Sequence, residues 1–283
     1  GLASTMSGQN FARLPGFRDF VPEDLALRAH LFEAWRRVAR RYGFREYDGP
    51  PLEPLDLYVE KSGEEIVGQL YNFTDKGDRA VSMRPEMTPS LARILGERSR
   101  GMSKPIRWFA IPQLFRYERQ QRGRLREHFQ WNVDVVGEAD EAADAEVLAV
   151  ALDGLRELGL TAEDVRARVS DRRLLAALLR EIGVPEDRLS GAYAVIDKLE
   201  RTPAEKSRER LVGEVGLAAG VADRLLALFD DPSLERIRAD FGGVERVAEH
   251  LEGMDRYLDI LADLGLADFV DFDLTIVRGL AYY

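Results

Sequence analysis

Residues 115–137 read FRYERQQRGRLREHFQWNVDVVG, and they indicate the architecture of the chain more clearly than any other segment. Its alternating apolar and polar side chains are typical of two strands, here joined by a long arginine-rich turn. In the predicted second strand, residues 128–136, one face carries Phe129, Trp131, Val133 and Val135, and the other carries His128, Gln130, Asn132, Asp134 and Val136. On the first strand, Arg116 and Glu118 share a face opposite Phe115 and Tyr117. Two neighbouring strands with charged rows backed by aromatic side chains predict a sheet that holds a charged ligand.

The turn between these strands, residues 119–127, contains Arg119, Arg122, Arg124 and Arg126 around Gly123. The whole chain is acidic, with a net charge of -10 and a pI near 5.1. A local block of arginines on such a chain favours anions, because a guanidinium group holds phosphate or carboxylate with two parallel hydrogen bonds. The alternative is a solvated surface hairpin, and the polar strand faces argue against it without excluding it.

Residues 115–137 resemble motif 2 of the class II aminoacyl-tRNA synthetases, in the form used by histidyl-tRNA synthetases. Residues 82–93, SMRPEMTPSLAR, resemble that family's amino-acid-binding segment, and residues 14–24, LPGFRDFVPED, resemble its N-terminal segment. Residues 274–283, LTIVRGLAYY, resemble the start of its histidine-specific signature. Four matches in the expected order are far more specific than one motif.

The resemblance implies an α+β fold, in which a class II synthetase-type antiparallel sheet is flanked by helices and carries a helical insertion. We expect residues 8–170 to form the catalytic sheet domain with motifs 1 and 2, and residues 171–265 to form the helical insertion. Residues 266–283 would supply a return strand and the start of the histidine signature. Residues 1–7 are expected to be a cloning remnant, because the segment before Met6 lacks the charged start and apolar core of a signal peptide.

Local patterns predict the main elements. An amphipathic helix is expected at residues 28–42, with Gly43 as its C-terminal cap, and an extended, proline-ended segment at 44–54. Strands are expected at residues 67–73, 79–83, 165–169 and 270–277, and helices at residues 144–158, 187–199, from 202, 221–229 and 244–264. The first helix and the strand after it resemble class II motif 1, which implies a homodimer through that helix. An ordinary core helix remains the alternative.

The resemblance implies activation of histidine by ATP, followed by transfer of histidine to tRNA(His). Arg116 and Arg278 would be the catalytic cations, since negative charge grows on the α-phosphate when the histidine carboxylate attacks it. For ATP binding, Arg116 would hold the α-phosphate, Glu118 would accept from the adenine amino group, and Arg124 would reach the outer phosphates. The cofactor expected is ATP with Mg²⁺, and no metal-ligand cluster is apparent in the sequence.

The expected histidine-binding residues are Glu86, Thr88, Arg116, Gln130, Asp134, Arg278, Tyr282 and Tyr283. Of these, the carboxylates and amide would face the ammonium group, and the tyrosine pair would line the imidazole pocket. Thr88 before Pro89 could equally be a helix N-cap. Two positions depart from the family pattern: Asp134 stands where many bacterial members have Glu, and His128 precedes Phe129 rather than following it.

Arg119 and Gln121 are candidates for contact with the tRNA acceptor end, because an acidic chain must bind nucleic acid locally. The role of His128 is left open, and His30 and His250 are expected to be surface or core residues. The absence of cysteine excludes disulfides and thiol nucleophiles and fits the cytoplasm. No apolar run is long enough for a membrane span.

The sequence ends at Tyr283, inside the segment that resembles the histidine-specific signature. Motif 3 and the anticodon-binding domain of the family are therefore expected to be missing, and the chain is expected to be a fragment of the full enzyme. One alternative is the regulatory subunit of ATP phosphoribosyltransferase, a non-catalytic relative without that domain. The other is a helical interaction protein with no small-molecule site.

Overall fold

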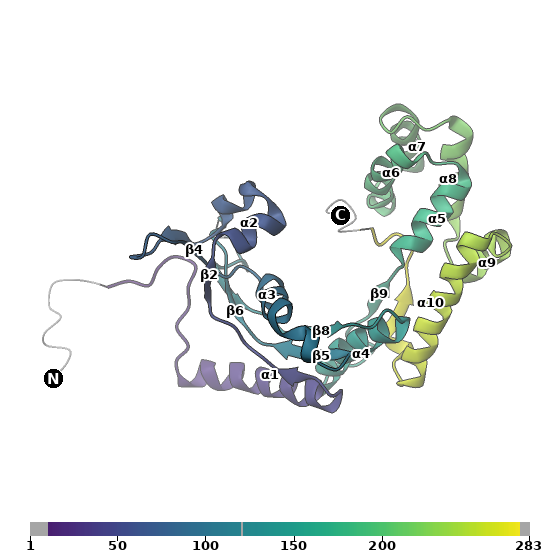
Figure 1. Cartoon of the computed structure of the whole chain (residues 1–283). Coiled ribbons are helices and arrows are strands. Elements are labelled where there is room, and N and C mark those ends of the chain that lie inside the picture. The colour runs from purple at the N-terminus through teal and green to yellow at the C-terminus, as the bar shows by residue number, and fades with distance from the viewer. Residues whose placement is uncertain (1–10, 120, 278–283) are drawn as a thin grey trace, which may run out of the picture. The chain divides into compact units, whose positions relative to one another are not determined.

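The computed structural model describes residues 11–119 and 121–277, and the chain divides into two compact units between Glu138 and Ala139 (Figure 1). In chain order, the first unit contains α1 (Pro22–Arg41), β1 (Arg45–Glu46), β2 (Leu52–Pro54), α2 (Asp56–Ser62), a 3₁₀ helix (Glu64–Gln69), β3 (Asn72–Thr74), β4 (Ala80–Met83), α3 (Thr88–Arg98), a 3₁₀ turn (Ser99–Gly101), β5 (Ile106–Ala110), β6 (Gln113–Phe115), β7 (Glu127–Phe129) and β8 (Asn132–Val136). The predicted α+β class is confirmed.

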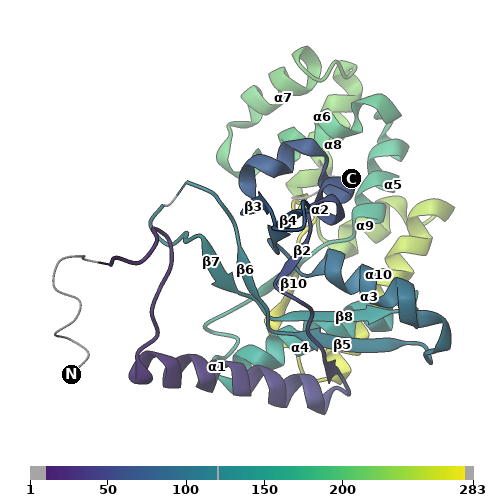
Figure 2. The same ribbon diagram turned by 60° about the vertical axis from the view of Figure 1, so that its left-hand side comes forward.

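The described strands of the first unit form three small sheets. The order β1-β5-β8 makes a mixed sheet in which β5 runs antiparallel to β8 with Trp108 opposite Asp134, while β2-β4-β3 and β6-β7 are antiparallel. Both views place α1 on one side of β5 and β8 and α3 on the other (Figures 1 and 2). Leu91 and Leu95 of α3 pack against Ile106 of β5. The edge position of β2 explains how it tolerates Pro54.

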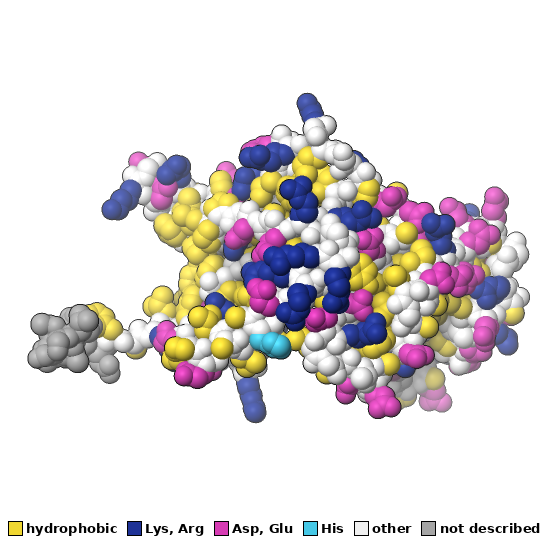
Figure 3. All heavy atoms as spheres, turned by 90° about the horizontal axis from the view of Figure 1, so that it is seen from below, with side chains coloured by type: hydrophobic (Ala, Val, Ile, Leu, Met, Phe, Trp, Pro, Cys, Tyr) yellow, Lys and Arg dark blue, Asp and Glu magenta, His cyan; other side chains and the backbone are white. Residues whose placement is uncertain are grey.

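Helix α1 begins earlier than predicted, because Pro22 occupies the first turn, where a missing N–H costs nothing. Its predicted apolar face is confirmed by the buried Val38 and Ala39. The predicted cap is also confirmed: Gly43 has φ +80°, and Gly43 N and Phe44 N donate to the carbonyls of Arg40 and Ala39. Seen from below α1, Lys and Arg side chains gather in the middle of the face, and the last turn of the helix carries Arg40 and Arg41 (Figure 3).

Two strand predictions in this unit are wrong. The segment predicted as a strand from Val67 is a 3₁₀ helix up to Gln69, because Gly68 has no side chain to pack and the Asn72 amide donates to the carbonyls of Val67 and Leu70. The expected strand 128–136 is split into β7 and β8, which belong to different sheets. Gln130 lies at the break, where its N–H donates to the Pro112 carbonyl.

The second unit is mostly helical. It contains α4 (Glu141–Glu157), β9 (Ala167–Val169), α5 (Arg172–Ile182), α6 (Leu189–Ile196), α7 (Ala204–Gly213), α8 (Ala219–Asp230), α9 (Leu234–Phe241), α10 (Glu245–Asp263), β10 (Val270–Phe272) and short 3₁₀ turns at Glu186–Arg188, Leu199–Arg201 and Ala267–Phe269. Helices α5, α6, α8, α9 and α10 share one apolar core, which includes Leu174, Leu178, Leu225, Ile237 and Leu251. The predicted assignment of residues 171–265 to an insertion and of 8–170 to a catalytic domain stays a prediction.

Two details of this unit differ from the sequence prediction. Strands β9 and β10 pair in parallel, but β10 ends at Phe272 rather than Val277. The cause is Asp273, whose carboxylate accepts from the N–H and hydroxyl of Thr275 and turns the chain. The helix predicted from residue 202, with Thr202 and Glu205 as a capping box, begins later: α7 starts at Ala204 after Pro203, and no side chain caps it.

Candidate active site

Five of the predicted site residues line one pocket of about 360 Å³ in the first unit. They are Glu86, Thr88, Arg116, Gln130 and Asp134, and they come from the start of α3, the end of β6, the β7–β8 break and β8. The pocket is also lined by Met87, Trp131, Asn132 and Val133. Residues separated by nearly fifty positions in the sequence therefore converge on one concave, mainly polar surface.

Arg84 fixes the segment that carries Glu86 and Thr88. Its side chain is buried, and its Nε donates to the Gln113 carbonyl at 2.9 Å, while one terminal nitrogen reaches the Gly49 carbonyl at 3.0 Å and the Asp48 carboxylate at 2.9 Å. The Phe115 N–H donates to the carbonyl of Arg84, which ties the same segment to β6. Arg84 does not line the pocket itself and holds the backbone behind it.

Thr88 is the first residue of α3 and not its N-cap, which is Met87, and no side chain caps this helix. The alternative that Thr88 is the N-cap is thus contradicted, and Thr88 lines the pocket. Met87 is completely buried.

The hairpin β6–β7 positions Arg116 and the predicted ATP residues. Gln121 and Arg124 close its turn through two backbone hydrogen bonds, and Gly123 has φ +78°, a conformation that suits glycine. Glu118 and Arg124, predicted to hold adenine and phosphate, lie 3.4 Å apart as an ion pair. ATP binding as predicted therefore requires this pair to separate. Arg119 is exposed on the hairpin, as a tRNA contact would need to be.

Asp134 and Glu86 have different electrostatic surroundings. Burial raises the pKa of the Asp134 carboxyl, and within the described residues it has no hydrogen-bond or ion-pair partner. Glu86, by contrast, accepts two hydrogen bonds from the ammonium group of Lys61, at 2.8 and 2.9 Å. Burial is the main cause that lowers the pKa of His128, and the positive charge of the neighbouring Arg116 is the second. The pocket thus combines one unpaired carboxylate, one paired carboxylate and the guanidinium of Arg116.

Two residues at the pocket, Asn132 and Lys61, were not predicted from the sequence. Asn132 lines the pocket between Gln130 and Asp134, and the alternating pattern of the strand could have predicted it. Lys61 lies near the end of α2, 25 positions before Glu86, and no local pattern connects the two. Arg278, Tyr282 and Tyr283 lie outside the described residues. Of the other histidines, His30 is exposed on α1, and His250 is half-buried on α10.

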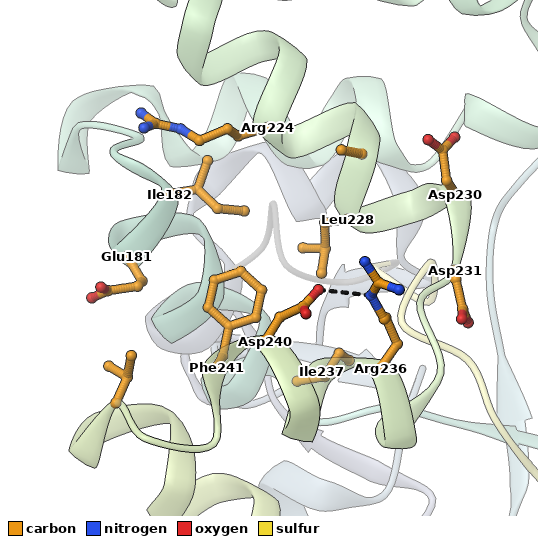
Figure 4. Close-up of a pocket in the computed structure, with 12 residues that line it drawn as sticks. Glu181, Ile182, Arg224, Leu228, Asp230, Asp231, Arg236, Ile237, Asp240 and Phe241 are labelled. Carbon is orange, nitrogen blue, oxygen red and sulfur yellow. Dashed lines mark hydrogen bonds and ion pairs between the residues drawn. The ribbon is translucent and has the colours of Figure 1, made fainter.

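A larger pocket of about 560 Å³ lies among α5, α8 and α9 of the second unit (Figure 4). Its floor is apolar, with Ile182, Leu228, Ile237 and Phe241 turned toward its centre. Four carboxylates and two guanidinium groups surround it, and Arg236 is paired with Asp240 at 2.8 Å. None of the residues predicted from the sequence to bind histidine or ATP lines this larger pocket, whereas five of them line the smaller pocket of the first unit, which is therefore the better candidate site.

In the part of the chain that the structure describes, no group of three or more acidic or histidine side chains is arranged to hold a metal ion. None of the helices described here is both long enough and apolar enough to cross a membrane.

A family model described as histidyl-tRNA synthetase matches residues 16–283. The chain belongs to the histidyl-tRNA synthetase family. Histidine–tRNA ligases from Opitutus terrae and Natronomonas pharaonis are 43% and 42% identical to it over 96% and 95% of its length. The chloroplastic/mitochondrial histidine–tRNA ligase of Arabidopsis thaliana is 41% identical over 95%. The chain spans 63%, 62% and 54% of the length of these three relatives, respectively.

Solved structures agree on the fold of this synthetase-family chain. The histidyl-tRNA synthetase of Nostoc sp. PCC 7120 superposes with a TM-score of 0.82 at 21% identity, over 97% of this chain and 63% of that one. A Bacillus halodurans protein described as an ATP phosphoribosyltransferase regulatory subunit/histidyl-tRNA synthetase gives 0.78 at 23% identity, over 96% and 70%. At these identities the likeness concerns the fold alone.

Proposed function

We propose that this chain is the part of a histidine–tRNA ligase that binds histidine and ATP and forms histidyl-adenylate. The observation that carries the proposal is the convergence of Glu86, Thr88, Arg116, Gln130 and Asp134 on one pocket. A zwitterionic amino acid needs carboxylates for its ammonium group and a cation for its carboxylate, and this pocket supplies both. Sequence identity above 40% to histidine–tRNA ligases supports the same activity.

In the proposed complex, Glu86, Gln130 and Asp134 surround the α-ammonium group of histidine, and Thr88 adds a hydroxyl. Arg116 holds the histidine carboxylate against the α-phosphate of ATP. The carboxylate oxygen attacks the α-phosphorus, the bond to pyrophosphate breaks, and pyrophosphate leaves. Arg116 stabilises the charge that develops on the phosphoryl oxygens, and most of the rate enhancement comes from positioning and electrostatics.

ATP, as its magnesium complex, is a substrate in this proposal. Glu118 accepts from the adenine amino group, and Arg124 leaves its ion pair with Glu118 to reach the outer phosphates. Arg278, together with Tyr282 and Tyr283, is proposed to complete the site as a catalytic cation and as the imidazole pocket. These three roles rest on the family resemblance of residues 274–283.

We further propose tRNA(His) as the acceptor of histidine, with Arg119 and Gln121 near its acceptor end, and a homodimer formed through α1 in the cytoplasm. Support for the dimer comes from the start of α1, where Val21, Leu25 and Leu27 are 53%, 41% and 64% exposed. Apolar side chains this exposed in one place are typical of a protein–protein contact. The mass of the chain in solution would test the dimer. Trp35→Ala is the control for the fold in that measurement, because Trp35 stacks on Trp131 within the unit.

Thermal unfolding of the chain with each of the twenty amino acids, with and without Mg-ATP, tests the proposed reaction. We expect stabilisation by histidine alone among the amino acids, and a larger shift when ATP is also present. A histidine shift that ATP leaves unchanged would favour the regulatory relative, which senses histidine without activating it. The absence of any shift with histidine would overturn the proposal.

A further inference from the structure

The ammonium group of Lys61 holds both carboxylate oxygens of Glu86, at 2.8 and 2.9 Å. Lys61 lies in the last turn of α2, and Glu86 lies just before α3. Among the described residues that line the pocket, Glu86 is present and Lys61 is absent. The lysine therefore reaches the carboxylate from outside the pocket, while the carboxylate itself faces the place where a ligand would lie.

The second carboxylate of the pocket, Asp134, is not paired with a cation among the described residues. Within the described residues it has no counter-charge, and burial alone accounts for its raised pKa. A ligand cation can thus approach Asp134 without displacing anything, whereas at Glu86 it meets a cation already in place. The two carboxylates cannot contribute equally to ligand affinity.

Simultaneous binding of the Lys61 ammonium and the ligand ammonium to the Glu86 carboxylate is unfavourable. Two ammonium groups bonded to the same carboxylate lie within a few ångströms of one another, and their repulsion is large in a half-buried site. The Lys61–Glu86 pair itself is half-exposed, with side-chain exposures of 49% and 31%, and an ion pair of this kind contributes little. Moving the flexible lysine into solvent therefore costs less than keeping both cations.

We propose that Lys61 is a displaceable counter-ion, which occupies the ammonium site on Glu86 in the empty pocket and is driven off by the α-ammonium group of the substrate. This inference rests on the proposed function, because it assigns Glu86 to that ammonium group. Lys61 then lowers the affinity for histidine and keeps Glu86 oriented and neutralised between turnovers. It is a residue that tunes affinity and does not take part in the chemistry.

Calorimetric titration of the chain with three ligands tests the proposal. L-histidine has both the ammonium and the carboxylate, L-histidinol keeps the ammonium alone, and imidazole-4-propionate keeps the carboxylate alone. We expect Lys61→Met to bind histidine and histidinol about three- to fivefold more tightly, and imidazole-4-propionate no more tightly. Lys61→Arg keeps a cation beside Glu86 and should bind all three ligands as the unsubstituted chain does.

Lys76→Met is the matched control, because it removes one lysine charge from an exposed turn of the same unit. Its affinities should not change, and melting temperatures of all variants check their folding. Unchanged or weaker binding of histidine by Lys61→Met would overturn the inference, as would an equal gain for imidazole-4-propionate. If the unsubstituted chain binds neither histidine nor histidinol, the proposed function fails and the inference with it.

Discussion

At the scale of single residues, Asp134 and Glu86 show how one pocket can hold two carboxylates with different tasks. Glu86 is neutralised by Lys61, while Asp134 is half-buried and has no such partner among the described residues. A buried charge without a partner lowers the stability of a fold, and sites that bind ions commonly retain such charges. In the proposed function, Asp134 therefore links ligand affinity to stability in this unit.

Asp134→Asn should stabilise the first unit by about 1 kcal/mol near pH 7 and greatly weaken histidine binding. Burial raises the pKa of Asp134 in the folded state above its ordinary value of 3.8. At a pH above the folded pKa, the ionised carboxylate lowers the stability of the folded state, whereas below pH 3.8 it is protonated in both states and has no such effect. The stabilisation should consequently disappear toward pH 4. All three tryptophans, Trp35, Trp108 and Trp131, belong to the first unit, so urea unfolding followed by their fluorescence measures this unit.

Asp134→Glu is the conservative partner of this variant and should retain histidine binding, since it keeps the carboxylate. Glu60→Gln removes an exposed carboxylate from α2 and controls for net charge. A decrease in stability for Asp134→Asn would show that the carboxylate has stabilising contacts, contrary to this account.

His128 should make the first unit less stable as the pH falls below about 6.5, the ordinary pKa of histidine. Its folded pKa is lowered, so the unfolded chain binds a proton more readily than the folded chain across the range between the two pKa values. His128→Gln should reduce the loss of unfolding free energy between pH 7.5 and 5.5. His30→Gln, which removes an exposed histidine of α1, is the control, and equal slopes for both variants would contradict the assignment.

At the scale of elements, the end of α1 depends on one glycine. Gly43 has φ +80°, and no atom lies within 4 Å of the place a Cβ would take, so Gly43→Ala should cost about 1 kcal/mol through the backbone alone. Gly96→Ala is the matched control for Gly43→Ala, because Gly96 is an exposed residue inside α3 and no atom lies within 4 Å of the place its Cβ would take. It should stabilise the unit by up to about 1 kcal/mol. Equal effects in tryptophan-monitored unfolding would rule out the cap as the cause.

The contact between α3 and β2 depends on a carboxylate that is almost completely buried. Glu53 is 1% exposed, and Arg93 binds it at 2.8 and 3.0 Å. Arg93→Met would leave this charge without its partner and should destabilise the unit by about 3 kcal/mol. Arg79→Met breaks an exposed pair with Asp75 and should lower the stability of the unit far less than Arg93→Met does. Comparable losses of urea midpoint for the two variants would contradict this difference.

Sequence patterns predicted elements where the signal is local. The apolar face and glycine cap of α1 are such signals, and so are the helices of residues 171–265. The prediction was wrong where distant contacts decide, as at Gln130, whose N–H leaves the strand to reach Pro112. Asp273 shows the opposite case, because a hydrogen bond to Thr275 ends a strand that apolar residues alone would continue.

The candidate site was predicted through motif resemblance, and local periodicity contributed the polar face that contains Gln130 and Asp134. Neither source indicates that Lys61 pairs with Glu86, since that contact depends on how α2 packs beside α3. The ion pair between Glu118 and Arg124 was also unforeseen, although both residues were assigned to ATP. Such contacts among the binding residues themselves form when the chain folds, and a linear pattern does not encode them.

At the scale of the whole molecule, the chain combines a first unit that contains the candidate pocket with a largely helical second unit. It spans 54–63% of the length of the histidine–tRNA ligases compared above. In the proposed function, the pocket of the first unit binds the ammonium and carboxylate groups of histidine, and Arg278, Tyr282 and Tyr283 complete the site. The position of these two histidine groups is therefore the part of the account that depends on residues the structure describes.

The most direct test is the crystal structure of the chain in complex with L-histidine. We predict that the α-ammonium group lies within hydrogen-bonding distance of Glu86 and Asp134, with the carboxylate toward Arg116 and the Lys61 ammonium withdrawn from Glu86. Histidine bound in the pocket of the second unit, or with its carboxylate facing Glu86 and Asp134, would contradict the account.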